Sequence, residues 1–248
     1  MNQYISIGEF QDHLKNYYNL FNIKLNFFEL SKYLYENNFL SSTYKKSTFL
    51  NLDDNLNDEE FFNLLNQYPI EINLNQITSN KYEVCEDDII PSNNDVYVIK
   101  HFRYLKNQLH SHNYFEINYV YKGSCNFYFE NDYKILNEGE LCIISPHSTH
   151  DIEIIDDDSI VITILIRKST FDTTFFSLLS QKDLLSYFFR NILYGNNEAN
   201  YLLFSTESSY KLKNILATTI CGEDDFAKKG VLTHSLFISY FCGRISIQ

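Results

Sequence analysis

The sequence of 248 residues has no tryptophan and one methionine, and it contains only three prolines and seven glycines. So little proline and glycine excludes collagen-like and low-complexity chains. Hydrophobic residues make up 44% and charged residues 21%, an ordinary globular balance, although the aromatic share of 17% is high. This length allows one large domain or two small ones with a substantial core.

Positive charge is also scarce. The chain has 20 Lys and Arg against 32 Asp and Glu, a formal net charge of −12. A domain that binds duplex DNA needs Lys and Arg to neutralise phosphates, usually on one basic face. Because no such cluster occurs, we predict that residues 1–248 alone do not bind duplex DNA specifically.

Long apolar runs and paired cysteines are missing as well. The longest apolar run, Ile160–Ile166, is interrupted by Thr163, whereas a bilayer requires about 20 apolar residues. No basic stretch followed by an apolar stretch opens the chain, so no signal peptide is predicted. These features predict a cytoplasmic protein with no membrane partner. Free thiols are expected for five cysteines without a CxxC pair: Cys85, Cys125, Cys142, Cys221 and Cys242.

Local patterns divide the chain into three regions. From about residue 8 to 68, aromatic residues and Leu recur at helical spacing. Between about 71 and 167, short runs rich in β-branched and aromatic residues alternate with turn signals, which is typical of a sandwich or barrel. Helical spacing returns afterwards. We predict an N-terminal helical region at 1–85, a barrel at 86–168 and a C-terminal helical region at 169–248.

The middle region is expected to form a series of short strands. Their predicted bounds are Asp95–His101, Glu116–Tyr121, Ser124–Glu130, Tyr133–Leu136, Leu141–Ser145, Asp151–Ile155 and Ile160–Arg167.

One segment, LHSHNYFEINYVYKG, carries most of the chemical information. It places His110 and His112 two residues apart, Glu116 four residues later and Gly123 seven beyond that. Residues two apart in a strand point to the same side. Both imidazoles and the carboxylate can therefore face the inside of one barrel.

A second cluster, EGELCIISPHSTH, has Gly139 turning into a strand, Pro146 ending it and His150 just beyond. Together the two clusters resemble the two cupin motifs, the first at every spacing. The second has Ser148 in place of a glycine and a shorter proline-to-histidine gap than metal-binding cupin enzymes. That variant is similar to the sensor domains of AraC/XylS-type transcription regulators, as is the run HNYFEINYVYKG. The resemblance covers residues 95–168 by motif and extends to Cys242 by layout.

The resemblance implies an α+β fold: a small cupin-type β-barrel, or double-stranded β-helix, flanked by N-terminal and C-terminal helices. It implies the effector-sensing and dimerisation part of a regulator, without enzymatic activity or cofactor. In the family, a small-molecule effector enters the barrel and the helices relay the change to a DNA-binding half that reads a promoter. That half follows the sensor, so we expect a helix-turn-helix domain after Gln248 and a sequence that is a piece of a longer protein.

Two roles remain open for His110, His112, Glu116 and His150. Three imidazoles and one carboxylate can bind a divalent transition metal, as in a cupin dioxygenase or isomerase. In the regulator family, these positions usually hold no metal and form hydrogen bonds at the barrel mouth. We predict the second role.

Other barrel residues also have two interpretations. Aromatic side chains can line an effector pocket or form core, and Arg103 can bind a carboxylate or lie in solvent. The predicted effector-binding set is His110, His112, Glu116, Tyr119, Tyr121, His150 and Arg103.

The last helix is expected at about residues 224–242. Its apolar stripe is wide enough to pack on a second copy in a homodimer, or to cover the chain's own core. The family resemblance favours dimerisation through Leu232, Leu236, Phe237, Tyr240 and Phe241.

Overall fold

The computed structural model describes residues 2–43, 57–73, 83–90, 94–130, 132–169, 187–191 and 201–205. The predicted C-terminal helix, with Leu232, Leu236, Phe237, Tyr240 and Phe241, lies outside them, and so do Cys221 and Cys242. The three cysteines within them, Cys85, Cys125 and Cys142, are free thiols, as predicted. The proposed division at residues 85 and 168 stays a prediction.

The N-terminal part contains three helices, α1 (Ile7–Phe21), α2 (Phe27–Glu36) and α3 (Asp58–Gln67). Each begins with a capping box, in which the cap side chain and a glutamate three residues later exchange hydrogen bonds with the backbone. The same region contains a pair of antiparallel strands that the sequence pattern did not predict, β1 (Asn2–Ser6) and β2 (Pro69–Asn73). Their strand character comes from pairing between residues about 70 positions apart, which local spacing does not reveal.

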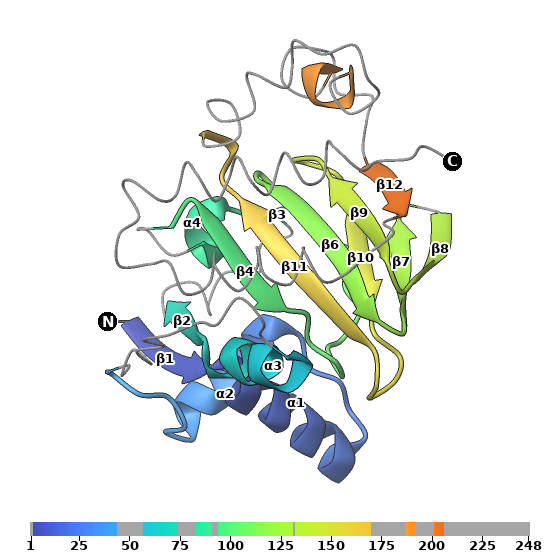
Figure 1. Ribbon diagram of the computed structural model, residues 1–248. Helices are drawn as coiled ribbons and strands as arrows, with labels where there is room; N and C mark the ends of the chain where they lie inside the picture. The colour runs from blue at the N-terminus through green and yellow to red at the C-terminus, as the bar shows by residue number, and fades with distance from the viewer. Residues whose placement is uncertain are drawn as a thin grey trace.

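A separate apolar core holds the N-terminal part together. Phe10 and Leu14 of α1 pack with Leu30 and Leu34 of α2, and all four are at most 2% exposed. Phe102, which follows the first barrel strand, joins this core and lies 4.8 Å from Phe10 between ring centroids. The N-terminal helices are therefore packed directly against the barrel (Figure 1).

The predicted barrel strands all form, with bounds within two residues of the expected ones. They are β4 (Val96–Lys100), β6 (Phe115–Lys122), β7 (Ser124–Phe129), β8 (Asp132–Asn137), β9 (Glu140–Ile144), β10 (His150–Glu153) and β11 (Ile160–Ile166). Three short elements were not predicted: β3 (Glu83–Val84), which pairs in parallel with β5 (Ser111–His112), and helix α4 (Glu86–Ile89). Strand β12 (Tyr201–Ser205) lies in the region expected to be helical and pairs with β9.

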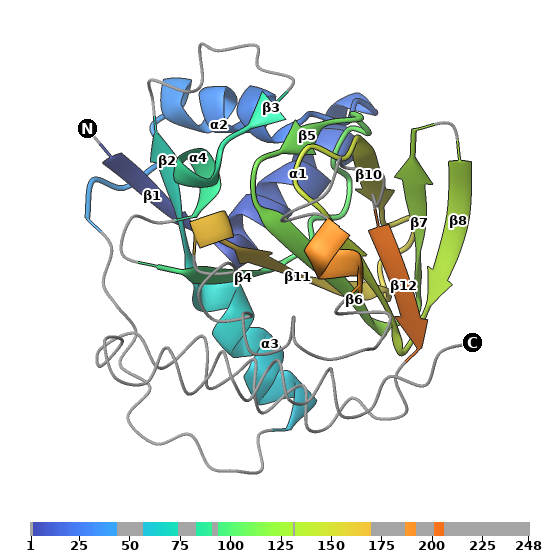
Figure 2. The ribbon, with the colours of Figure 1, turned by 90° about the horizontal axis from the view of Figure 1, so that it is seen from above.

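The strands form two facing antiparallel sheets. The larger has the order β12-β9-β6-β11-β4 and the smaller the order β10-β7-β8 (Figures 1 and 2). Their inner faces share a core in which Val120, Phe127 and Val161 are at most 1% exposed. These observations confirm the predicted α+β fold with a cupin-type barrel.

The outer face of the larger sheet is partly covered by α3. The Tyr121 hydroxyl of β6 donates a hydrogen bond to Asp58 of α3 at 2.6 Å, and its ring lies against Phe61 and Phe62. Figure 2 shows α3 on one side of this sheet and β7, β8 and β10 on the other. The inner face is thus left to the barrel interior.

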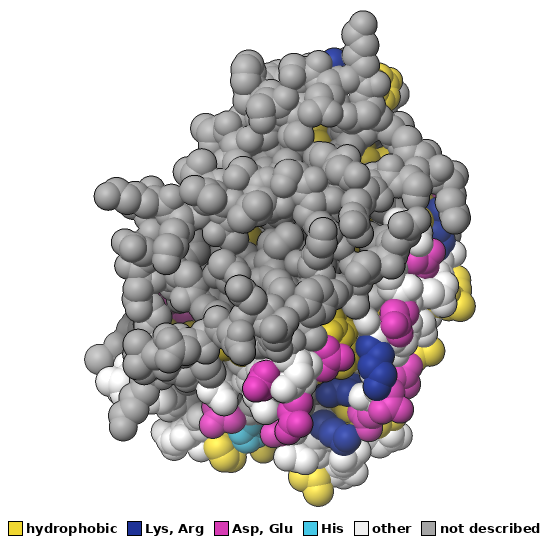
Figure 3. Space-filling view, viewed as in Figure 1, with side chains coloured by type: hydrophobic (Ala, Val, Ile, Leu, Met, Phe, Trp, Pro, Cys, Tyr) yellow, Lys and Arg dark blue, Asp and Glu magenta, His cyan; other side chains and the backbone are white. Residues whose placement is uncertain are grey.

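Acidic and basic side chains are interspersed on the described part of the surface seen in Figure 3. None of the helices that the structure describes has the length and apolarity needed to cross a bilayer.

Candidate functional site

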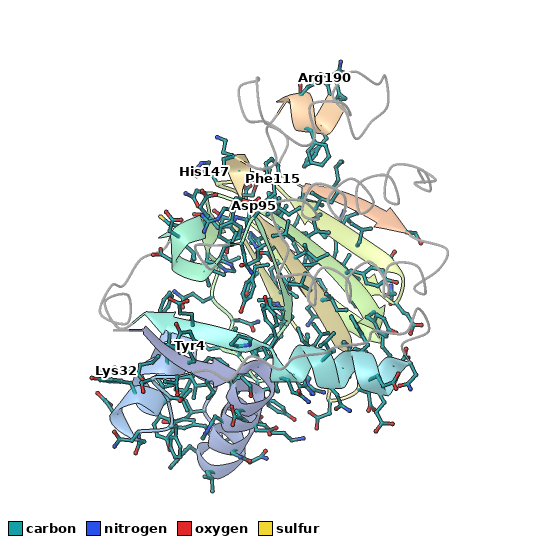
Figure 4. The ribbon with its side chains drawn as sticks, turned by 60° about the vertical axis from the view of Figure 1, so that its left-hand side comes forward. Tyr4, Lys32, Asp95, Phe115, His147 and Arg190 are labelled. Carbon is teal, nitrogen blue, oxygen red and sulfur yellow. The ribbon has the colours of Figure 1, made fainter. Side chains whose placement is uncertain are left out.

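Four of the predicted site residues gather at one end of the barrel. The ring centroids of His112 and His150 lie 4.9 Å apart, and those of His110 and His150 lie 4.7 Å apart. The backbones of His110 and His150 exchange two hydrogen bonds of 3.0 Å, which fixes the approach of the two motifs. Phe115 and His147 mark this end in Figure 4, while Tyr4 and Lys32 mark the N-terminal part, farther down in the same view.

Glu116 lies at the centre of the cluster and is only 6% exposed. Its carboxylate oxygens lie 3.3 Å from Nε2 of His112 and 3.6 Å from Nε2 of His150, in geometry short of a hydrogen bond. Asn118 donates a hydrogen bond from Nδ2 to Oε1 at 2.7 Å. Glu116 and Asn118 are two residues apart on β6, so both point to the barrel interior.

The second ring nitrogen of each histidine faces a backbone carbonyl. Nδ1 of His110 lies 3.1 Å from the backbone oxygen of Gln108. Nδ1 of His112 lies 2.8 Å from that of Tyr114, and Nδ1 of His150 lies 3.0 Å from that of Ser148. A carbonyl only accepts, so the hydrogen-bond network assigns the proton to Nδ1 in each ring. Nε2 is then an acceptor whenever the ring is neutral.

Burial and the central carboxylate set the charges of the cluster. Burial alone raises the pKa of Glu116, but the contacts with His112 and His150 outweigh it and hold that pKa well below its usual range. For His150, burial lowers the pKa, and the Glu116 carboxylate more than reverses this, so the net pKa is raised. Burial lowers the pKa of His112, and it lowers that of His110 to about 4. The cluster therefore contains one charged carboxylate whose main proton-holding partner is His150.

A buried polar chain continues from Glu116 across the sheet. Thr163 of β11 donates a hydrogen bond to Oδ1 of Asn118 at 2.6 Å, and Nδ1 of His101 lies 3.3 Å from the Thr163 hydroxyl. Asn118 and Thr163 are at most 2% exposed. Neither residue was predicted to belong to the site, although Asn118 lies two positions after Glu116 and Thr163 interrupts an apolar strand.

A cavity of about 180 Å³ lies between this end of the barrel and the N-terminal part. Of the predicted effector-binding residues, His110, Glu116 and His150 line it. Most of the other lining residues are apolar or aromatic. They include Phe27 of α2, Ile70 of β2, Tyr97 and Ile99 of β4, Phe102, Leu105, Tyr114, Ile152 of β10 and Leu165 of β11.

The remaining predicted effector residues lie elsewhere. Tyr119 and Tyr121 are an odd number of positions from Glu116, so they point to the outer face of the sheet. His112 lies beside the cavity lining, stacked on Tyr114 with ring centroids 4.1 Å apart. Arg103 donates to the backbone oxygen of Asp157 on the β10–β11 loop. The described lining of the cavity includes none of these four.

The cluster also fits a metal ion. One ligand atom from each of His110, Glu116 and His150 can be chosen so that all lie within 4.8 Å of one another. Two imidazole nitrogens and a carboxylate oxygen suit a divalent transition metal. Nε2 of His150 is buried and has no hydrogen bond, so it is available as a ligand.

Several solved structures resemble parts of this chain. Among solved structures, an apo form of ToxT from Vibrio cholerae is 14% identical over 60% of this chain and 55% of its own, with a TM-score of 0.43. ToxT from the same organism bound to an unsaturated fatty acid is 21% identical over 60% of this chain and 52% of its own, with a TM-score of 0.35. KdgF from Halomonas sp. is 22% identical over 30% of this chain and 71% of its own, with a TM-score of 0.26.

The chain thus spans little more than half the length of the ToxT structures. No curated protein matches it. Residues 96–173, which include β4 to β11 and every residue of the histidine cluster, match the family described as the AraC-like ligand binding domain. The part of the chain that forms β4 to β11 is therefore similar to AraC-like ligand binding domains.

Proposed function

We propose that this chain is the effector-sensing part of a transcription regulator and has no enzymatic activity of its own. The observation that carries the proposal is the cavity, which has apolar walls and a polar floor of His110, Glu116 and His150 within an AraC-like ligand-binding domain. Apolar walls with a few convergent polar groups are typical of small-molecule sites. A regulator that reads a promoter shares its compartment with DNA, so we propose a cytoplasmic location.

The position of the cavity suggests how a bound effector acts. Its walls come from Phe27 and Ile70 of the N-terminal part, from Leu105 in the connecting segment, and from Ile99 and Leu165 of the barrel. A molecule bound there contacts both parts at once. It therefore stabilises the arrangement in which both parts close on it, and it shifts the population toward that arrangement. This differential contact is the physical basis we propose for signalling to the DNA-binding half.

Filling the cavity should abolish binding. Ile99 of β4 lines it and is partly buried, so Ile99→Trp places an indole where the effector would lie. We expect the affinity for the neutral aromatic probe 1-naphthylmethanol to fall at least about tenfold, because a ring of similar size already occupies the space. Titration calorimetry on the 248-residue chain measures this.

The matched control is Ile155→Trp, which adds the same ring at a side chain that is 63% exposed and does not line the cavity. Circular dichroism checks that both variants are folded. Equal probe affinity in the two folded variants would contradict the proposed site.

We further propose that the chain forms a homodimer through residues 224–242 and that promoter DNA binds a domain after Gln248. Leu232, Leu236 and Tyr240 recur every four residues, with Phe237 and Phe241 beside them. Two-fold pairing is the commonest oligomer symmetry.

We expect Leu236→Glu to convert the dimer into a folded monomer. A buried, unpaired carboxylate would oppose packing of this apolar stripe against the same stripe of the second subunit. Sedimentation reads the assembly, and circular dichroism separates it from unfolding. A folded dimer of this variant, or a monomeric wild type at tens of micromolar, would refute the proposed interface.

The competing function is a cupin metalloenzyme, and the close grouping of His110, Glu116 and His150 favours it. The metal would polarise a bound substrate, while the chain's residues would hold the ion and shape the cavity. Elemental analysis of the purified chain discriminates between the two functions. One transition metal per chain, lost in His112→Ala and His150→Ala, would replace the sensor proposal with the enzyme.

A further inference from the structure

The floor of the cavity presents mainly hydrogen-bond acceptors. Nδ1 of His110 and Nδ1 of His150 are directed at backbone carbonyls, so their donor capacity is already used. Glu116 offers carboxylate oxygens, and Nε2 of His150 is buried without a hydrogen bond. When His150 is protonated, the Glu116 carboxylate compensates its charge, with Oε1 3.6 Å from Nε2.

Asp151 adds a second buried carboxylate to the lining. It is 8% exposed and accepts a hydrogen bond from the backbone N–H of Gln108 at 3.0 Å. Among the residues that the structure describes, no Lys or Arg forms an ion pair with it. A buried carboxylate of this kind is best stabilised by a cation that arrives with its own hydrogen-bond donors.

Lys106 lines the cavity but does not balance these charges. Nζ of Lys106 lies 3.7 Å from Glu29, and its side chain is 54% exposed, so it sits at the solvent side. Two further carboxylates, Glu71 and Asp88, also line the cavity. A ligand carboxylate, which only accepts hydrogen bonds, would meet acceptors and like charges at the floor.

We propose that the cavity recognises an amphiphile with a ring-sized apolar body and a cationic, hydrogen-bond-donating head such as a primary amine. Asp151 provides the counter-charge for the head, and Glu116 provides acceptor oxygens. The body lies against Phe27, Ile99 and Leu165. This inference rests on the proposed function of the cavity as an effector site and names the chemical class of the effector.

Three probes with one naphthalene body separate the head groups: 1-naphthylmethylamine, 1-naphthylmethanol and 1-naphthoic acid. Titration calorimetry on the 248-residue chain near neutral pH compares them at equal ionic strength. We expect the amine to bind at least about tenfold more tightly than the acid, with the alcohol between them. The ranking needs no variant and therefore does not depend on any substitution folding correctly.

Asp151→Asn tests the counter-charge, because it removes one charge while keeping the shape and the acceptor for Gln108. Affinity for the amine should fall about tenfold, and affinity for the alcohol should stay within about twofold. Glu36→Gln removes the same charge from an exposed side chain of α2 outside the cavity and should change neither.

The experiment distinguishes failure of the proposed head-group class from failure of the proposed effector site. An acid that binds as tightly as the amine, or an amine affinity that Asp151→Asn leaves unchanged, would overturn this inference and leave the cavity as an effector site. Absence of binding for all three probes would overturn both.

Discussion

Replacing Glu116 by Leu should lower the free energy of unfolding by about 3 kcal/mol, because removal of one partner from a buried ionic cluster leaves the others uncompensated. Asn118 would lose the acceptor of its 2.7 Å hydrogen bond, and the rings of His112 and His150 would lose the carboxylate between them. Glu116→Gln keeps the shape and one acceptor, so its cost should be smaller.

Urea unfolding followed by circular dichroism measures this difference. Glu36→Leu makes the same substitution at a side chain that is 59% exposed, and it should stay within about 0.5 kcal/mol of wild type. A loss below about 1 kcal/mol for Glu116→Leu would mean that the carboxylate does not organise the cluster.

The free energy of unfolding that Glu116→Leu loses should also depend on pH. The pKa of Glu116 is lowered on folding, so its stabilisation is present above the ordinary value of 4.5 and is lost as the pH falls through the folded pKa. The pKa of His150 is raised, so its stabilisation is complete below 6.5 and is lost as the pH rises through the folded pKa. The difference between wild type and Glu116→Leu should therefore be largest between about pH 4.5 and 6.5.

Burial of His110 acts in the opposite direction, because its lowered pKa costs stability below pH 6.5. Glu116 raises the pKa of His110, so its loss in Glu116→Leu would enlarge this cost and add to the difference between the two proteins at acidic pH. A deficit that does not change with pH would assign the effect of Glu116 to packing alone.

The sequence predicts the barrel well because successive residues of a strand face opposite sides, so apolar and polar side chains alternate along it. The even spacing of His112 and Glu116 predicts that they face one side, and the structure brings them to 3.3 Å, although His112 lies in β5 and Glu116 in β6. The same rule, applied strictly, separates Tyr119 and Tyr121 from Glu116 and adds Asn118. The polar side chain of Thr163 in an apolar strand was a further signal of the buried network.

Other parts of the site were beyond local patterns. The cavity exists because Phe27 and Ile70, far apart in the sequence, meet the barrel mouth, and no periodicity in either segment reports that contact. Strands β1 and β2 likewise depend on pairing between distant residues, such as Ile5 with Ile70. The charge of the floor follows from burial of Asp151, and burial at a strand end depends on what packs over it.

A second large effect is expected at Gly123, in the turn between β6 and β7. Its φ is +74°, a conformation that costs a residue with a side chain about 1–2 kcal/mol. A Cβ placed there would lie 2.2 Å from the hydroxyl oxygen of Ser159 and 3.0 Å from its Cα. We therefore expect Gly123→Ala to lower the free energy of unfolding by about 3 kcal/mol in urea titrations, since backbone strain and overpacking add.

Ser159 cannot simply turn away from the new methyl group. It is 2% exposed, and its hydroxyl accepts a hydrogen bond from the Ser124 N–H at 2.9 Å and donates one to Asp156 at 2.8 Å. Ser159→Ala removes the closest atom but leaves the backbone contact, so Gly123→Ala should cost about 1 kcal/mol less in that background. The residual cost then measures the strain of the turn together with the remaining contact to Cα and Cβ of residue 159. Equal costs in the two backgrounds would show that the hydroxyl is not what excludes a side chain, and a total cost below about 1 kcal/mol would show that the turn relaxes without opposing the substitution.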